Sequence, residues 1–399
     1  MKLEDADLGI VIDDEFPCSS AGEMRVLGSG VYEIGYQPEE IPKWFQDLLD
    51  ELFDGKGVPK EYMAHVRMHN TGDVARRVTL KFLFSEKGSN YLYPPWFVRR
   101  EDGGWAWIPP DDTDFEAHEY LNASVDLQPG ESVRIASAPY EEPDVVCEKA
   151  RQLAQRYDLW TYREIGTSAQ GRPIPVLETE PRELKLLVDA TMQSCEPVSW
   201  GILHVGHWLT IPTARTQRLL DEIQFCLMPM TNPDGVYVGH SVTNAVGEVP
   251  KFGINNLVEG KGAARETEAL WAYLLDLKPD ASIEVHAHFT REGFTRSIGI
   301  HDPASMPIEM QDKAKVIEAA IFENFHADPL DNRKVLIDPR LPEHNVYGDR
   351  YVSEHAGTIR TFLQAVPDGI ESHCADVREM VETVADGLVK WKHSLEGQA

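Results

Sequence analysis

Cysteine is scarce in this sequence. There are 5 cysteines among 399 residues, they are scattered, and no two form a CxxC pair. An odd and scattered set argues against a disulfide framework and favours reduced thiols in a cytoplasmic protein. The five positions are Cys18, Cys147, Cys195, Cys226 and Cys374.

Long apolar runs are also missing. No stretch approaches the roughly 20 apolar residues that a membrane-spanning helix needs. The first residues, MKLEDADLGIVIDDEF, are acidic and lack the apolar segment of a signal peptide. We therefore expect a cytoplasmic protein without a membrane partner.

Basic residues are in the minority, with 38 Lys and Arg against 66 Asp and Glu and a formal net charge of −28. This charge would repel nucleic acids and anionic membranes, so neither is an expected partner. The acidic residues form no long block, which favours solubility as the reason for them. Internal repeats and low-complexity tracts are absent, and the length suggests two or three domains.

Residues 1–140 have the character of a β-rich domain. Short stretches rich in β-branched and aromatic residues, such as EYMAHVRMHN and RRVTLKFLFS, alternate with turn sequences such as NTGD and EDGG. This spacing predicts an antiparallel β-sandwich. One exception, IPKWFQDLLDELFDGKG, has apolar residues at helical spacing and predicts an amphipathic helix.

Residues 141–399 alternate between helical and strand patterns. Predicted strands include PIPVLETE, LKLLVDA, IQFCLMPMTNP, ASIEVHAHF and RTFLQAVPDGIESH, and predicted helices include PVSWGILHVGHWL, ARETEALWAYLLDLK and ADVREMVETVADGLVKWKHSL. Such alternation predicts an α/β domain with a mixed central sheet flanked by helices. We place the boundary between the two domains at residue 140.

Polar residues stand at the ends of four of these strands, where sites form in open α/β sheets. Gln193 and Glu196 follow LKLLVDA, Asn232 follows IQFCLMPMT, His286 lies on SIEVHAH, and the last strand, which ends before SHC, carries Glu371. A glutamate, a histidine and an amide can together hold a divalent metal, and a second carboxylate can act as general base. The chemistry predicted is metal-assisted hydrolysis.

Several motifs follow one another in a familiar order: EIGTSAQGRPIPVLE, QSCEPVSW, PMTNPDGV, IEVHAHF and GIESHC. In this order they resemble the zinc carboxypeptidase (funnelin) family, and in particular its cytosolic carboxypeptidase branch. The resemblance extends to the preceding β domain with its exit ASAPYEEPDVV, and so covers nearly the whole chain. It implies a carboxypeptidase-like fold and a Zn²⁺ cofactor, or another divalent metal.

The resemblance also implies roles for single residues. Glu196 and His286 match two zinc ligands, Gln193 stands where the family has its first histidine ligand, and Glu371 matches the general base. Gln193 either coordinates the metal, more weakly than imidazole, or only binds a metal-bound water.

The substrate-binding residues implied are Asn232, His288 and Tyr347. Asn232 could instead hold the turn, because Asn-Pro-Asp-Gly is strong turn chemistry by itself. Tyr347 is one of two tyrosines in a segment where the family has a mobile tyrosine, and packing is the alternative for both.

A second departure from the family follows NPDG. The oxyanion-stabilising arginine falls near Val242, and no arginine occurs before Arg265, so His240 is the candidate donor and Lys251 the other cation nearby. Losing such a donor costs about 10²–10³ in rate. The arginine that reads a terminal carboxylate is missing as well, so a simple exopeptidase is not expected.

Two functions remain open. The first is metal-dependent hydrolysis of an amide or peptide-like bond in a non-standard substrate, including a non-peptide one. The alternative is a catalytically lapsed protein that binds a peptide or small metabolite. The structural alternatives for the ligands are that Glu196 only caps the following helix and that His286 is a core histidine. The sequence does not set the oligomeric state.

Overall fold

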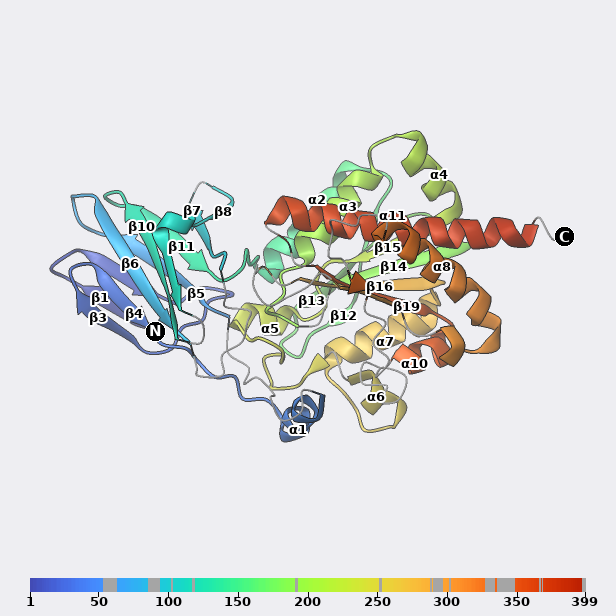
Figure 1. Cartoon of the computed structure of the whole chain (residues 1–399), viewed down its shortest axis with the longest axis horizontal. Helices are drawn as coiled ribbons and strands as arrows, with labels where there is room; N and C mark the ends of the chain where they lie inside the picture. Colours follow the sequence, from blue (N-terminus) through green and yellow to red (C-terminus); the bar gives the residue numbers. More distant parts are fainter. Residues whose placement is uncertain are drawn as a thin grey trace.

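The computed structural model describes residues 1–52, 63–84, 94–101, 103–116, 119–190, 193–250, 253–287, 289, 297–300, 303–326, 334–335, 349–365, 367 and 369–396. Two strand-rich layers lie at one end of the molecule and an α/β body at the other (Figure 1). The long C-terminal helix crosses the α/β body, and the chain ends at the side away from the two layers.

The N-terminal layers are two sheets. One has the order β1 (Lys2–Asp5), β2 (Ile10–Asp13), β5 (His65–Asn70), β11 (Ser132–Ala136), β7 (Phe97–Arg100), β8 (Trp105–Trp107). The other has the order β3 (Met24–Gly28), β4 (Val31–Ile34), β6 (Arg76–Leu83), β10 (Tyr120–Leu127), β9 (Thr113–Glu116). Alternating residues such as Val78, Leu80 and Phe82 of β6 are buried in the core that the two sheets share.

The prediction of purely antiparallel pairing is wrong at one place, because β4 pairs with β6 in parallel. A parallel pair needs a long crossover, and the chain makes one here by passing through α1 (Lys43–Leu52) and β5 of the other sheet. The helix α1 itself matches the predicted amphipathic segment.

The α/β body contains one mixed sheet of eight strands. Its order is β12 (Thr161–Thr167), β13 (Pro173–Glu178), β15 (Ile223–Met228), β14 (Leu184–Ala190), β16 (Ala281–Ala287), β19 (Ile359–Ala365), β17 (Ser297–Ile300), β18 (Lys334–Val335). The four central strands, from β15 to β19, run parallel, and the strands that join them on both sides are antiparallel. The predicted mixed sheet is confirmed.

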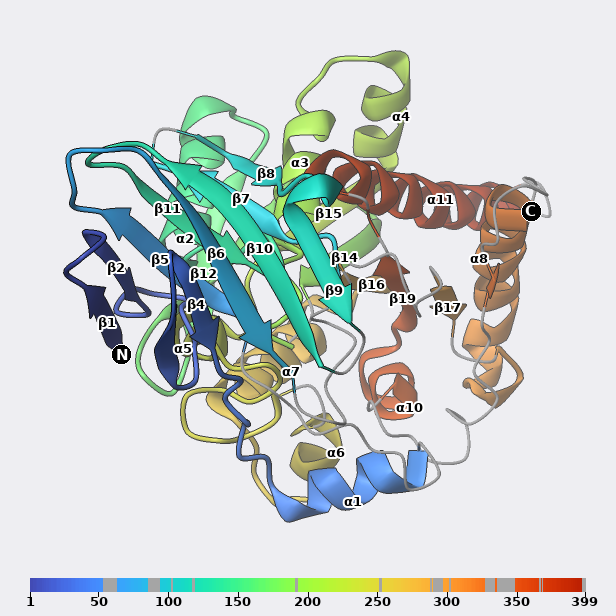
Figure 2. The ribbon, with the colours of Figure 1, turned by 60° about the vertical axis from the view of Figure 1, so that its left-hand side comes forward.

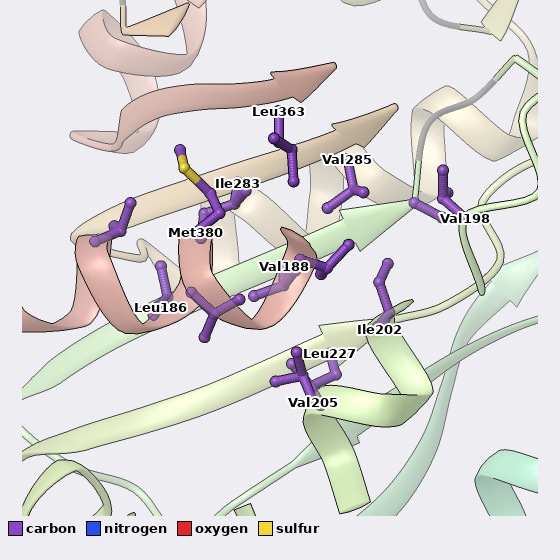
Figure 3. Packing of buried hydrophobic residues seen from close by; sticks show 14 of the residues in the cluster. Leu186, Val188, Val198, Ile202, Val205, Leu227, Ile283, Val285, Leu363 and Met380 are labelled. Atoms are coloured by element: carbon purple, nitrogen blue, oxygen red, sulfur yellow. The ribbon is translucent and has the colours of Figure 1, made fainter. Parts of the chain in front are cut away.

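Helices cover both faces of this sheet (Figure 2). One face carries α2 (Pro143–Arg156), α3 (Ser199–Leu209), α8 (Ile308–His326) and α11 (Ile370–Glu396), and Figure 3 shows side chains of α3 and α11 packing onto β14, β15, β16 and β19. The opposite face carries α6 (Gly253–Val258), α7 (Arg265–Leu277) and the π-helical segment Val352–Ala356 after α10 (Asp349–Tyr351). The short helices α4 (Ala214–Glu222) and α5 (Pro233–Val238) precede and follow β15.

The N-terminal layers and the α/β body share buried contacts. Met63, Phe97 and Ala136 belong to the same buried cluster as the strands of the mixed sheet. The ring of Phe97 on β7 meets Phe289, just beyond β16, edge to face with centroids 5.7 Å apart. The outer face of the β5–β11–β7 sheet is therefore fixed near the end of β16.

None of the helices in the described part of the chain combines the length and the apolarity needed to cross a membrane. All five cysteines are free and buried, so the predicted absence of disulfides agrees with the structure.

His373, in the first turns of α11, gives a prediction about pH. Its ring is fully buried, and burial lowers its pKa from the ordinary 6.5 to about 4. The unfolded chain therefore binds this proton more readily, and the stabilising contribution, complete above pH 6.5, is lost as the pH falls toward 4. We expect the free energy of unfolding to fall over this range, by up to about 1.4 kcal/mol per pH unit for this one group.

Denaturant titrations from pH 7 to pH 4 measure that slope. The slope should be smaller in His373→Gln than in wild type, whereas His355→Gln, at an exposed position, should keep it. Equal slopes in wild type and His373→Gln would refute this assignment.

Candidate functional site

The turn after β14 brings Glu196 to the end of β16. Glu196 is 4% exposed, and its Oε2 lies 2.9 Å from Nδ1 of His286 and accepts a hydrogen bond from the backbone N–H of Ala287 at 3.2 Å. The helix α3 begins two residues beyond Pro197 and has Val198 as its N-cap, without a side-chain cap. The glutamate thus contacts the histidine rather than capping the helix.

His286 is held by carboxylates on both sides of its ring. Nδ1 faces Glu196, and Nε2 lies 2.9 Å from Oε1 of Glu284. Glu284 is two residues earlier on the same strand, so both side chains are on one face of the sheet. That face is opposite the one that packs against α3 and α11, where Ile283 and Val285 point. His286 is therefore more than a core histidine, because it joins two buried acids.

This pair continues into a buried network of charges. Arg360 on β19 donates from Nη2 to Oε2 of Glu284 at 2.6 Å, and the same nitrogen is 3.9 Å from Oδ2 of Asp189 on β14. Asp189 and Glu284 lie opposite each other in the parallel register. All five side chains are less than 9% exposed. We call Asp189, Glu196, Glu284, His286 and Arg360 the buried charge network.

Sequence reasoning missed three members of this network, Asp189, Glu284 and Arg360. A signal was available: each is a charged residue inside a strand in which most residues are apolar and buried. Such a residue needs a partner of opposite charge, and only neighbouring strands can supply one there.

The prediction for Glu371 is wrong in its structural part. Glu371 is not on a strand but in the first turn of α11, and it is exposed. The strand ends at Ala365, before Pro367 and Gly369, and from there Cys374, Val377 and Val381 recur at helical spacing and are buried. The general-base role is withdrawn with the strand.

Gln364 occupies the position beside His286. The two residues are paired in the parallel register of β16 and β19, so their side chains leave the same face of the sheet. Within the described part of the chain, Nε2 of Gln364 is buried and lacks a hydrogen-bond partner. An amide at this place does not take up a proton as a carboxylate does.

The loop after α5 lies against the turn that carries Glu196, because the N–H of Cys195 donates to the carbonyl of Ser241 at 3.0 Å. Val242, where the resemblance places an arginine, is a fully buried side chain. The carboxylate of Glu39, in the connection between β4 and α1, accepts hydrogen bonds from the backbone N–H groups of Ser241, Val242 and Thr243 and from the Thr243 hydroxyl, at 2.6–3.3 Å.

His240 is engaged in the same loop. Its Nδ1 lies 2.8 Å from the Thr243 hydroxyl, 3.0 Å from the carbonyl of Asn244 and 3.8 Å from Glu39. Burial lowers the pKa of His240, and the opposing effect of the Glu39 charge is smaller. The ring is therefore neutral at pH 7. A neutral ring committed to its own loop is a weak candidate for stabilising an oxyanion.

Asn232 and Asp234 hold the turn at the start of α5. The Asn232 side chain caps α5 by accepting from the N–H of Gly235 at 2.9 Å and donates to the carbonyl of Thr243 at 3.3 Å. Asp234 is bound by Arg172 and by the Ser168 hydroxyl at 2.6 and 2.7 Å. Both are buried, so the turn-holding alternative is favoured over substrate contact for Asn232. His288, Tyr347 and Lys251 lie outside the described residues.

Comparison with known proteins agrees with this fold. Residues 146–271 match the family model of the zinc carboxypeptidases. A metallo-carboxypeptidase from Burkholderia cenocepacia superposes with a TM-score of 0.74 at 15% identity, over 96% of this chain and all of that one. The predicted resemblance to the zinc carboxypeptidase family is confirmed.

A metallo-carboxypeptidase from Pseudomonas aeruginosa, solved in complex with (2-guanidinoethylmercapto)succinic acid, superposes with a TM-score of 0.72 at 14% identity, over 95% of this chain and 99% of that one. No curated protein matches the sequence. At such identities the likeness establishes the carboxypeptidase-like metallopeptidase fold, which includes the N-terminal layers, and leaves the chemistry to the residues present.

The resemblance to zinc carboxypeptidases implies zinc, and two of the residues that could ligate it, Glu196 and His286, lie together. Nδ1 of His286 and Oε2 of Glu196 are 2.9 Å apart, close to the separation of about 3.3 Å between two ligands that share a tetrahedral zinc at about 2.0–2.1 Å. Glu284 behind the ring is the kind of partner that orients a ligating imidazole.

The position of the third ligand, Gln193, does not fit zinc well. A catalytic zinc uses three protein ligands, and Gln193 offers only a neutral amide oxygen. Among the described residues there is no group of three or more His, Cys, Asp or Glu side chains arranged to hold a metal. The described residues therefore do not complete a catalytic zinc site.

A small cavity lies beside this turn. It has a volume of about 20 Å³ and is lined by Tyr140, Glu141, Ala190, Gln193, Ser194, Glu196, Pro197, Val198, Ser199, Pro229, Met230 and Val236. Such a volume accommodates about one water molecule or one small polar group.

The buried charge network predicts a large effect at Arg360. The variant Arg360→Met removes the cation beside two buried carboxylates, and we expect a loss of about 3–5 kcal/mol in the free energy of unfolding. Denaturant unfolding measures it, with Arg350→Met as the control, because Arg350 bonds Glu354 on an exposed helix surface. Equal stabilities of the two variants would contradict a structural role for the network.

Glu39 gives a second prediction. Replacing its carboxylate by an amide, in Glu39→Gln, keeps the shape but puts an N–H₂ group among N–H donors, and we expect a loss of about 2–3 kcal/mol. The neighbouring exposed Glu40→Gln is the matched control and should change stability by less than about 0.5 kcal/mol. If thermal and chemical unfolding do not distinguish the two variants, the Glu39 contacts contribute nothing to stability.

Proposed function

We propose that this protein is a catalytically lapsed, carboxypeptidase-like protein that binds a peptide or a small amide at the turn of Gln193 and Glu196. The observation that carries the proposal is that the two positions flanking the Glu196–His286 pair are amides. Gln193 precedes Glu196 in the turn, and Gln364 is the register neighbour of His286.

The described groups around the Glu196–His286 pair support this proposal. Hydrolysis of an amide needs a base that activates water and returns the proton to the leaving amine. Gln364 cannot do this, and Glu371 is exposed on α11. Glu196 and Glu284 are both engaged with His286, and Glu284 also with Arg360.

The loop of residues 240–244 also lacks a group for a developing oxyanion. Val242 is aliphatic and buried, and the backbone amides of residues 241–243 are hydrogen-bonded to Glu39. Negative charge close to them would be repelled by the Glu39 carboxylate rather than stabilised.

What remains at the turn is suited to binding. The Gln193 amide lines the small cavity together with the Glu196 carboxylate and Tyr140, and it is partly exposed. An amide offers both a donor and an acceptor, which match the C=O and N–H of a peptide group. The cavity has room for one such polar group of a ligand.

The second candidate is a metal-dependent hydrolase acting on a non-standard amide. It is favoured by the separation of His286 Nδ1 and Glu196 Oε2 and by Glu284 behind the ring. In this case Gln193 would be the third ligand, and zinc would supply an activated water. Metal content and hydrolysis separate the two candidates.

We expect wild-type protein, purified without a His tag and dialysed against zinc and then against buffer, to retain well under one equivalent of metal by elemental mass spectrometry. Gln193→His should retain more, because imidazole is the stronger ligand. Glu196→Ala and His286→Ala, each made in the Gln193→His background, should lose it again.

Hydrolysis is measured on the same samples with a panel of N-acylated dipeptides. Wild type and Gln193→His should release no amine above the buffer rate, and Gln193→His/Gln364→Glu, which adds a carboxylate beside His286, is the variant in which cleavage can return. Stoichiometric zinc together with turnover in wild type would refute the lapsed-enzyme proposal and establish the hydrolase. Peptides that are not cleaved should raise the melting temperature of wild type.

A further inference from the structure

A second concavity lies outside the site. It has a volume of about 430 Å³, which is in the range of small-molecule pockets. Its lining shares no residue with the cavity at Gln193. The lining residues come from α2 (Lys149, Gln152, Leu153 and Arg156), α3 (Trp200, Leu203, His204 and His207) and α11 (Cys374). We call this concavity the α2–α3 groove.

Two matching helix stripes build the α2–α3 groove. On α2 the lining residues stand at positions 149, 152, 153 and 156, and on α3 at positions 200, 203, 204 and 207. Both sets follow the i, i+3, i+4, i+7 spacing of one helix face. Each helix therefore presents one continuous face to the same space.

The floor and the rim of the groove differ in chemistry. Leu153 and Leu203 are buried, and the partly exposed Trp200 is fixed by its indole N–H, which donates to the carbonyl of Pro139 at 2.8 Å. Nζ of Lys149 lies 4.1 Å from the centre of the Trp200 ring. An aromatic and aliphatic floor thus lies beneath a rim of nitrogen donors.

The charge of the groove is opposite to that of the chain. The protein has 66 acidic residues and a net charge of −28, yet none of the nine lining residues is acidic. Lys149 and Arg156 are cations, and His204 and His207 add ring nitrogens. Lys149 is paired with Glu141, whereas Arg156 is exposed and contacts the ring of Tyr157. The Arg156 guanidinium is the group placed to take a ligand's anionic end.

Burial lowers the pKa of His204 and of His207, with contributions from the nearby cations Arg378 and Arg156 respectively. Both rings are therefore neutral at pH 7 and can act there as hydrogen-bond partners. The charge preference of the groove is set by its permanent cations, Lys149 and Arg156.

We propose that the α2–α3 groove is a binding site for a small aromatic carboxylate, whose ring lies against Trp200, Leu153 and Leu203 and whose carboxylate faces Arg156. The inference is independent of the function proposed for the Gln193 turn. Guanidinium binds carboxylate through two parallel hydrogen bonds, which makes Arg156 the residue that decides between an acid and its neutral amide.

The test is calorimetric titration of the full chain at pH 7.5 with 2-naphthoate, 2-naphthamide and acetate. Wild type should bind naphthoate at least about tenfold more tightly than either of the others, because acetate lacks the ring and naphthamide lacks the charge. Arg156→Glu should weaken naphthoate binding by at least about tenfold and leave naphthamide unchanged. Lys315→Glu, on the exposed surface of α8, makes the same change in net charge and should bind like wild type.

Trp200→Leu tests the floor and should weaken naphthoate and naphthamide alike. Melting curves of each variant check that the fold is kept, and Arg156→Glu alone decides the case if Trp200→Leu fails to fold. The proposal is overturned if naphthoate binds wild type no better than acetate, or if Arg156→Glu and Lys315→Glu bind it equally. Loss of naphthoate binding in Gln193→Ala would show that the ligand binds at the Gln193 turn and would also overturn the proposal.

Discussion

The structure depends on one guanidinium that compensates the charge of two buried carboxylates in the middle of the mixed sheet. Asp189 and Glu284 lie opposite each other on neighbouring parallel strands, and two carboxylates so close inside a protein repel each other strongly. Arg360, from the next strand, lies within 3.9 Å of both. With this charge in place, Glu284 can hold one side of the His286 ring while Glu196 holds the other.

These contacts give the turn after β14 a defined position through groups of the protein alone. The carboxylate of Glu196 is bound by the imidazole of His286 and by a backbone amide at the end of β16. The loop of residues 240–244 then packs on the turn through Cys195 and Ser241, and Glu39, from the connection between β4 and α1, binds three successive amides of that loop. The β4–α1 connection thus holds the loop on one side of the turn, and the mixed sheet holds Glu196 on the other. The contact between Glu196 and His286 is therefore held by groups of the protein itself.

The sequence carried the local structure well where periodicity is strong. The helices from Ser199 and Arg265 and the strands LKLLVDA and SIEVHA were predictable, because short, mostly apolar runs typical of buried strands alternate with longer stretches of helix-forming residues. The prediction of a strand at Glu371 failed because the apolar run RTFLQAV continues directly into PDGIESH. The helical spacing of apolar residues becomes visible only after Ile370. The parallel pairing of β4 with β6 could not be predicted from the sequence either, because strand direction depends on where the chain returns after a crossover.

For the site, the sequence by itself determined which chemical groups are available: a glutamate and a histidine at strand ends, Gln193 where the resemblance places a histidine, and no arginine between NPDG and Arg265. These follow from residue identity and order alone. Only the tertiary structure decided which groups meet. The opposition of Gln364 to His286 is a matter of strand register, and the contact of Glu39 with Val242 joins residues 203 positions apart. Register and long-range contacts come from packing of the whole chain, and no local pattern of residues encodes them.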